Sequence, residues 1–204
     1  AIAQTNLKRM LAYSTIAQMG FLLLGMIAGV VNGNTLSAAN AYSSSLFYIL
    51  TYVVTTLGTF GLIMLLSRQG FEAEDIADLA GLHKRSPVLA AVMAIFLFSL
   101  AGVPPMVGFH AKLAVLQALI TTNDPVLLQL AIFGVVMSLI GAFYYIRVVK
   151  VMYFDEPKET AAIVTPGGAR AVLSLNGVVV LLLGIIPGGL MTLCSQAIVK
   201  SLAQ

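Results

Sequence analysis

Lys112 lies in the middle of an apolar stretch that is long enough to cross a membrane. It lies about ten residues, or about 15 Å of helix, from the Thr121-Thr122 pair that ends the stretch. A charge at that depth costs about 3 kcal/mol on insertion scales, so such residues usually face a protein interior or a water-filled cavity and mark ion or proton pathways. We predict that Lys112 transfers protons there. The alternative, extension to the outer interface, is disfavoured because the side chain does not easily reach from mid-depth.

The segment just before Lys112 must interrupt the helix. Its helix-breaking residues are Gly102, Pro104, Pro105 and Gly108. Two adjacent prolines remove backbone donors and clash with the preceding turn, so a continuous helix cannot pass. Unwound backbone at membrane depth needs protein or water around it, and broken helices recur in ion-coupled transporters. The break and the lysine together predict a transport function.

Other polar side chains lie near this lysine or within the remaining spans. His110 lies two residues before Lys112 on a different helix face, and we interpret it as a structural group, with a proton relay as the alternative. The neutral polar residues within the spans are Gln18, Thr51, Thr55, Thr56, Thr59, Gln117 and Ser138. We expect most of them to bond to neighbouring helices or to their own backbone, and one or two to hold water.

The composition requires a membrane around these residues. Apolar residues make up 59% and charged residues 9% of the chain, against roughly 25% charged in a soluble domain. A helix needs about 20 apolar residues to cross the bilayer core, and no stretch alternates as a barrel strand would. We predict an all-α, polytopic transmembrane helix bundle that forms a single domain over residues 1–204. Its five predicted spans cover about 10–31, 39–66, 87–120, 126–152 and 171–193.

Charge placement predicts how the third span crosses. As one continuous helix, residues 87–120 would extend about 50 Å, so they form either two crossings or one crossing made of two half-helices. With one crossing, nine basic residues share a side: Lys8, Arg9, Arg68, Lys84, Arg85, Arg147, Lys150, Lys158 and Arg170. The opposite side then keeps only Lys200. With two crossings, the basic residues would instead be divided far more evenly between the two sides of the membrane. The strong bias favours one broken crossing, with the basic loops cytoplasmic and the C-terminus outside.

The connecting segments carry most of the other charges. Residues 67–86 contain an acidic group, which we expect to be the solvated face of a short amphipathic surface helix: Glu72, Glu74, Asp75 and Asp78. We expect Arg147 and Lys150 to anchor the chain at the cytoplasmic interface. The chain starts at Ala1 with neither Met nor a signal sequence, which we interpret as a piece of a longer protein.

Several other functions are disfavoured. The eleven basic residues are scattered among the spans, so we predict no nucleic-acid partner. The chain lacks a nucleotide-binding glycine fingerprint, and Cys194 is its single cysteine, so we predict neither a cofactor nor a metal in this chain. A purely structural scaffold, in which Lys112 is paired and inert, stays open as an alternative.

Three stretches are similar to those of a known family. Residues 6–16, NLKRMLAYSTI, resemble a signature of proton-conducting, antiporter-like membrane subunits. Residues 98–105, FSLAGVPP, with 108–112, GFHAK, resemble the broken helix and buried lysine of that family. Residues 141–154, GAFYYIRVVKVMYF, are similar to subunit N of the bacterial respiratory NADH:quinone oxidoreductase, complex I.

The resemblance implies a specific place for this chain. It would be the C-terminal part of a subunit with two inverted repeats, and Lys112 would pass protons between the central polar axis and the outer aqueous side. The implied partners are other membrane subunits of complex I, in the lipid bilayer of the bacterial inner membrane. NADH, FMN, iron–sulfur clusters and quinone would bind in other subunits. The alternative is a subunit of a multisubunit cation/proton antiporter, which has the same fold and lysine.

The chain also departs from the family pattern. Gln18 stands where many relatives carry a histidine, so we expect no protonation role there. The second span has no His or Lys, unlike the two larger antiporter-like subunits, which favours subunit N. His110 stands where an apolar residue is common, so no family role is transferred to it.

Overall fold

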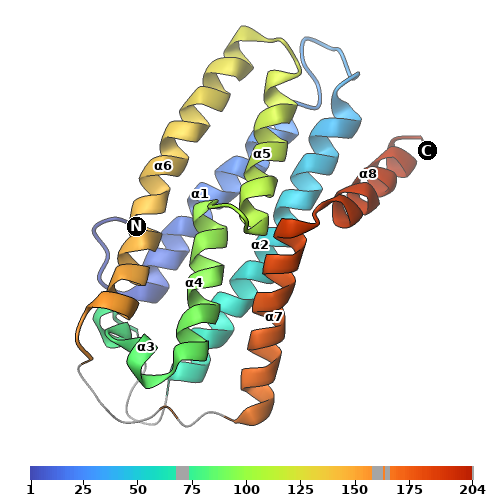
Figure 1. The fold of residues 1–204 in the computed structure, drawn as a ribbon. Coiled ribbons are helices and arrows are strands. Elements are labelled where there is room, and N and C mark those ends of the chain that lie inside the picture. The colour runs from blue at the N-terminus through green and yellow to red at the C-terminus, as the bar shows by residue number, and fades with distance from the viewer. Residues whose placement is uncertain (68–73, 158–162, 164–165, 204) are drawn as a thin grey trace.

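The computed structural model describes residues 1–67, 74–157, 163 and 166–203, and every regular element in these ranges is a helix. The predicted all-α class is therefore confirmed. The long helices of the bundle are α1 (Leu7–Ile27), α2 (Ala38–Leu66), α4 (Pro87–Ala101), α5 (Val107–Ile120), α6 (Pro125–Phe154) and α7 (Gly167–Ile185). Two short helices, η1 (Ile76–Leu79) and α3 (Leu82–Arg85), join α2 to α4 at the lower end of the bundle (Figure 1). A last helix, α8 (Gly188–Leu202), follows α7.

Side-chain caps explain where several helices begin. Asn6 accepts a 2.9 Å hydrogen bond from the amide of Arg9, so α1 begins at Leu7, three residues before the predicted start. Asp124 accepts from the amides of the first turn of α6, with Pro125 at the first helical position. These caps satisfy amides that have no partner within the helix.

Four helices in the described part are long and apolar enough to cross a membrane: α1, α2, α6 and α7. Helices α4 and α5 are shorter, with 15 and 14 residues. Helix α4 ends at Ala101, where Gly102 takes a left-handed φ of +85°, and Pro104 and Pro105 lie before α5. In Figure 1, α4 runs from the lower end to the middle of the bundle, and α5 continues from there to the upper end.

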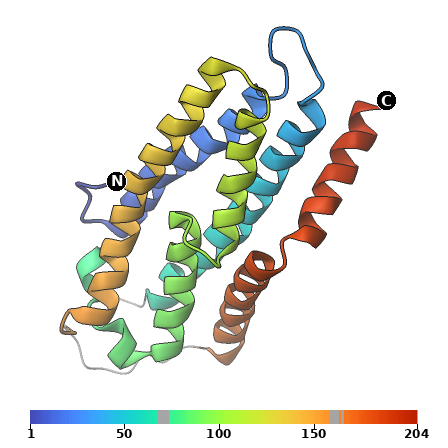
Figure 2. The same ribbon diagram turned by 45° about the horizontal axis from the view of Figure 1, so that its top comes forward.

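The stretch predicted as one span over 171–193 is divided in the structure. Helix α7 ends at Ile185, and α8 begins at Gly188. Pro187 lacks an amide donor, and it is followed by Gly188 and Gly189, which have a low helix propensity. Helix α8 changes direction at this point and packs against α2 (Figure 2).

The basic side chains at the lower end hold neighbouring segments together. Arg147 on α6 donates to the carbonyls of Ile2 and Gln4, before α1. Lys150 forms an ion pair with Asp155. The two predicted anchors therefore have partners within the chain, while the membrane position that was predicted for them stays a prediction.

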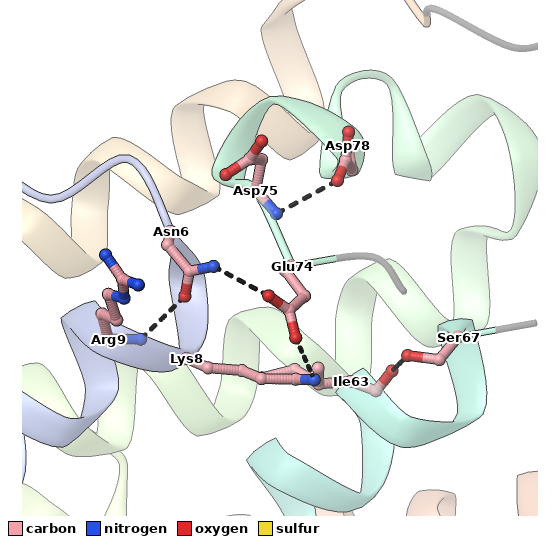
Figure 3. Close-up of polar contacts among 8 residues, drawn as sticks. All are labelled: Asn6, Lys8, Arg9, Ile63, Ser67, Glu74, Asp75 and Asp78. Carbon is pink, nitrogen blue, oxygen red and sulfur yellow. Dashed lines mark hydrogen bonds and ion pairs between the residues drawn. The ribbon is translucent and has the colours of Figure 1, made fainter. Parts of the chain in front are cut away.

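The acidic segment before α3 combines solvent exposure with contacts inside the chain. Glu74 accepts from Lys8 Nζ at 2.7 Å and from Asn6 Nδ2 at 3.1 Å, so it pairs with the start of α1 while its side chain stays 36% exposed (Figure 3). Asp75 and Asp78 form a capping box around η1. Asp75 is exposed, as predicted, while Ile76, Leu79 and Leu82 of this connection are buried. Glu72, Arg68 and Lys158 lie outside the described residues.

Close packing of α2 on α4 depends on Gly58, because a Cβ atom there would overlap the buried Phe96 ring. We expect Gly58→Ala to destabilise the full-length protein by about 1–3 kcal/mol through overpacking. The measurement is the thermal denaturation midpoint of the detergent-solubilised protein. Gly20→Ala is the matched control, because a Cβ on Gly20 has no neighbour within 4 Å. Equal midpoints for the two variants would contradict this packing argument.

Candidate functional site

Lys112 lies on α5, and its side chain extends back toward the interrupted end of α4. Its Nζ donates to the carbonyl of Ala101 at 2.9 Å and to that of Leu100 at 3.2 Å. A third hydrogen bond, 2.8 Å long, goes to Ser138 Oγ on α6. These bonds use all three donors of an ammonium group.

The interruption itself supplies the acceptors for this amine. The last carbonyls of α4 have no partner in a following turn, and they form the negative end of the helix dipole. Both features stabilise a cation at this position. The ring of Phe21 on α1 adds a cation–π contact, with its centroid 5.3 Å from Nζ. A continuous helix would have consumed the same carbonyls in its own hydrogen bonds.

Two glycines allow the two half-helices to come this close. Gly102 adopts its left-handed conformation beneath the lysine, and a Cβ there would lie 2.9 Å from Lys112 Cδ. A Cβ on Gly108 would overlap the carbonyl of Ser99 on α4. The Gly108 amide also donates to Ser99 Oγ at 3.2 Å. The two glycines predicted as part of the break thus lie in contact with Lys112 and with the end of α4.

In the described part of the chain, no carboxylate pairs with Lys112. The ion pairs found there lie at the lower end of the bundle, between Lys8 and Glu74, Lys84 and Glu156, and Lys150 and Asp155. Within those ranges, the charge of Lys112 is therefore stabilised by dipoles and by an aromatic face alone.

Gln18 on α1 connects the same carbonyl to a buried tyrosine pair. Its Nε2 donates to Leu100 O and to the Tyr145 hydroxyl, both at 3.0 Å. Its Oε1 accepts from the Tyr48 hydroxyl, and Tyr145 in turn shares a hydrogen bond with Ser14. Gln18 is 5% exposed, so all of these bonds lie in the interior. Lys112 and Gln18 thus meet at one backbone acceptor.

A small cavity of about 20 Å³ lies between Lys112 and α2, and this volume is enough for about one water molecule. Its polar lining consists of Gln18, Tyr48, Thr51, Tyr52, Thr55 and Ser99, together with Lys112 itself. The amine therefore has a bonded neighbour, Ser138, on α6 and room for water on the side of α2.

Sequence reasoning missed three residues of this network, namely Ser14, Tyr48 and Tyr145. A signal for the first two existed. Ser14 and Gln18 are four residues apart on α1, and polar residues recur at helical spacing along α2, at 48, 51, 52, 55 and 59. Such a polar stripe in an apolar helix indicates a face that turns toward other helices. Tyr145 carries no comparable pattern.

Other predicted residues lie outside the contacts of Lys112. Thr51, Thr55 and Thr59 donate to carbonyls one turn earlier in α2, in agreement with the prediction of own-backbone bonds. The His110 ring meets Phe109 edge-on, with centroids 5.4 Å apart, and no described hydrogen bond joins it to Lys112. Across the described ranges, no group of three His, Cys, Asp or Glu side chains could hold a metal ion.

Comparison with known proteins identifies the family of this chain. The family model for NADH:quinone oxidoreductase/Mrp antiporter membrane subunits matches residues 1–158. Subunit N of the NADH-quinone oxidoreductase of Polaromonas naphthalenivorans is 62% identical over 97% of this chain, and that of Herminiimonas arsenicoxydans is 59% identical over 100%. A chain of respiratory complex I from Thermus thermophilus superposes with a TM-score of 0.76 at 29% identity, over 93% of this chain and 40% of its own length.

The chain spans 40% of the length of both subunit N relatives. The similarity to subunit N that was predicted from residues 141–154 is confirmed by these relatives, and the family model also includes that stretch. Because that model covers well over half of the chain, this protein belongs to the family of NADH:quinone oxidoreductase/Mrp antiporter membrane subunits.

Proposed function

We propose that this chain is the C-terminal, proton-conducting part of a subunit N of bacterial NADH:quinone oxidoreductase. The proposal rests on the position of the Lys112 amine. It donates to the last carbonyls of α4 and to Ser138, and it lies beside a polar cavity. An amine without a fixed carboxylate partner can lose and regain its proton without leaving a buried anion behind. Electron transfer from NADH to quinone takes place in other subunits, which bind FMN, iron–sulfur clusters and quinone.

In this proposal the chain crosses the membrane five times as one domain, and α4 and α5 together form one broken crossing. Their end-to-end arrangement in Figure 1 supports one crossing. The starts of α1, α4 and α7 and the end of α6 lie at the same end of the bundle, and these segments carry most of the basic residues. We assign that end to the cytoplasm of a bacterium and the C-terminus to the outer side of its inner membrane. Other membrane subunits of the complex are the expected partners.

Protons would reach Lys112 through water in the cavity between it and α2. They would leave along α5 and α6 toward the end of the bundle that lies away from the basic segments. A polar hollow of about 840 Å³ lies at that end, between the α1–α2 and α5–α6 turns. Its polar residues include Asn32, Asn34, Asn40, Thr121, Thr122 and Asp124. It offers contact with outer water. His110 has no bond to the Lys112 network among the described residues, so it stays outside this path as a structural group.

A cation/proton antiporter subunit is the second candidate, because the family includes both kinds of complex. The names and identities of the two curated relatives favour the oxidoreductase. Co-purification of the full-length protein with NADH:quinone reductase activity supports the first proposal. Sodium-dependent proton exchange without that activity would favour the antiporter instead.

Replacing Lys112 with methionine tests the central role. In the complete complex, we expect Lys112→Met to slow proton transfer through this subunit by about 100-fold or more, since methionine cannot carry a proton. The measurement is proton uptake into membrane vesicles per NADH oxidised. Lys200→Met, at the end of α8, is the matched control and should pump normally. Unchanged pumping in Lys112→Met would leave the scaffold interpretation standing.

Gln18→Leu tests the network that supports this site. Leucine leaves the Tyr48 hydroxyl without its buried acceptor, while Tyr145 keeps its bond to Ser14, and an unsatisfied buried group costs about 1–3 kcal/mol. We expect a lower denaturation midpoint of the solubilised complex, with proton pumping retained if the complex assembles. Gln117→Leu is the control, because Gln117 is exposed on α5. A midpoint equal to that of Gln117→Leu would show that the network adds no stability.

A further inference from the structure

The end of α7 lies directly against the interruption between α4 and α5. A Cβ atom on Gly184 of α7 would overlap Pro105 O and would lie 2.6 Å from Val107 N and 2.7 Å from the carbonyl carbon of Met106. Real Cβ atoms are not found this close to backbone, so the contact exists because residue 184 is a glycine. It joins two backbones without an intervening side chain.

Lys112 contacts the other end of the same interruption. Its side chain passes over Gly102, and its amine binds the carbonyls of Leu100 and Ala101. The segment 102–106 is therefore held between Lys112 at its start and Gly184 at its end. Because this segment is short and contains two prolines, a displacement at Pro105 is transmitted to the carbonyls rather than absorbed by the backbone.

The contact between Gly184 and the interruption lies in the last turn of α7. Helix α7 ends at Ile185, and after Pro187 the chain continues in a new direction as α8. The two helix interruptions therefore lie at the same level of the bundle, and both views of the fold agree on this (Figures 1 and 2). The change of direction follows from Pro187, which ends the hydrogen bonding of α7.

We propose that Gly184 is a positioning residue for Lys112, through which α7 fixes the carbonyl end of α4. This inference rests on the proposed role of Lys112 in proton transfer. A larger residue at 184 pushes segment 103–106 away from α7, and the amine then loses its alignment with Leu100, Ala101 and Ser138. The position of α7 thus controls the geometry around the lysine.

The test compares Gly184→Ala with Gly188→Ala in the full-length complex, because a Cβ on Gly188 has no neighbour within 4 Å. We expect Gly184→Ala to lower proton uptake per NADH oxidised by about tenfold, since small misplacements of a reacting group are costly. The backbone amides of Gly102, Val103 and residues 106–108 should also exchange hydrogen about tenfold faster. Gly188→Ala should change neither readout. Unchanged exchange in Gly184→Ala would overturn the proposal.

Two further outcomes separate this proposal from the function on which it rests. If Lys112→Met pumps normally, the proposed function fails, and amide exchange in Gly184→Ala still decides whether the contact holds the interruption. If Gly184→Ala does not assemble, the exchange of residues 182–189 is measured in Lys112→Met. Faster exchange there supports the link between the lysine and α7, and unchanged exchange overturns it.

Discussion

The structure depends on one constraint, which is that a helix ending inside an apolar bundle leaves carbonyl groups that need a donor. Helix α4 ends in this way at Ala101, because two prolines follow. Lys112 supplies two of the required hydrogen bonds, and Gln18 supplies another to Leu100. The break and the partly buried amine therefore satisfy each other's hydrogen-bonding groups, since each would be costly alone. The glycines at 102, 108 and 184 follow from this arrangement, because each allows close contact around the break.

Much of this arrangement was predictable from composition and from two residue types. Long apolar stretches predicted the helices, and adjacent prolines predicted the interruption, because both effects act within one segment of chain. Lys112 was identifiable because a charge in such a stretch is rare. The residues that divide the last span, Pro187, Gly188 and Gly189, are a recognisable helix-breaking signal in the sequence. They were not predicted to end the helix because the stretches on both sides are apolar.

The partners of these residues were harder to predict, because they come from distant parts of the chain. Ser138 and Tyr145 lie on α6, 26 and 127 residues from their partners Lys112 and Gln18. Which face of α6 turns toward α1 and α5 depends on how the helices pack, and one sequence does not contain that information. Glu74 is similar, since its bonds to Lys8 and Asn6 connect segments on either side of two long helices.

The side-chain amide of Gln18 restricts the route that a proton could take near Lys112. A carboxamide carries fixed donors on nitrogen and an acceptor on oxygen, and unlike an imidazole it cannot take up a proton on one atom and release one from another. Gln18 can therefore orient the two tyrosine hydroxyls but cannot conduct charge between them and the lysine. In the proposed proton path, a proton would therefore pass Gln18 through the cavity that this residue lines, and not through its side chain.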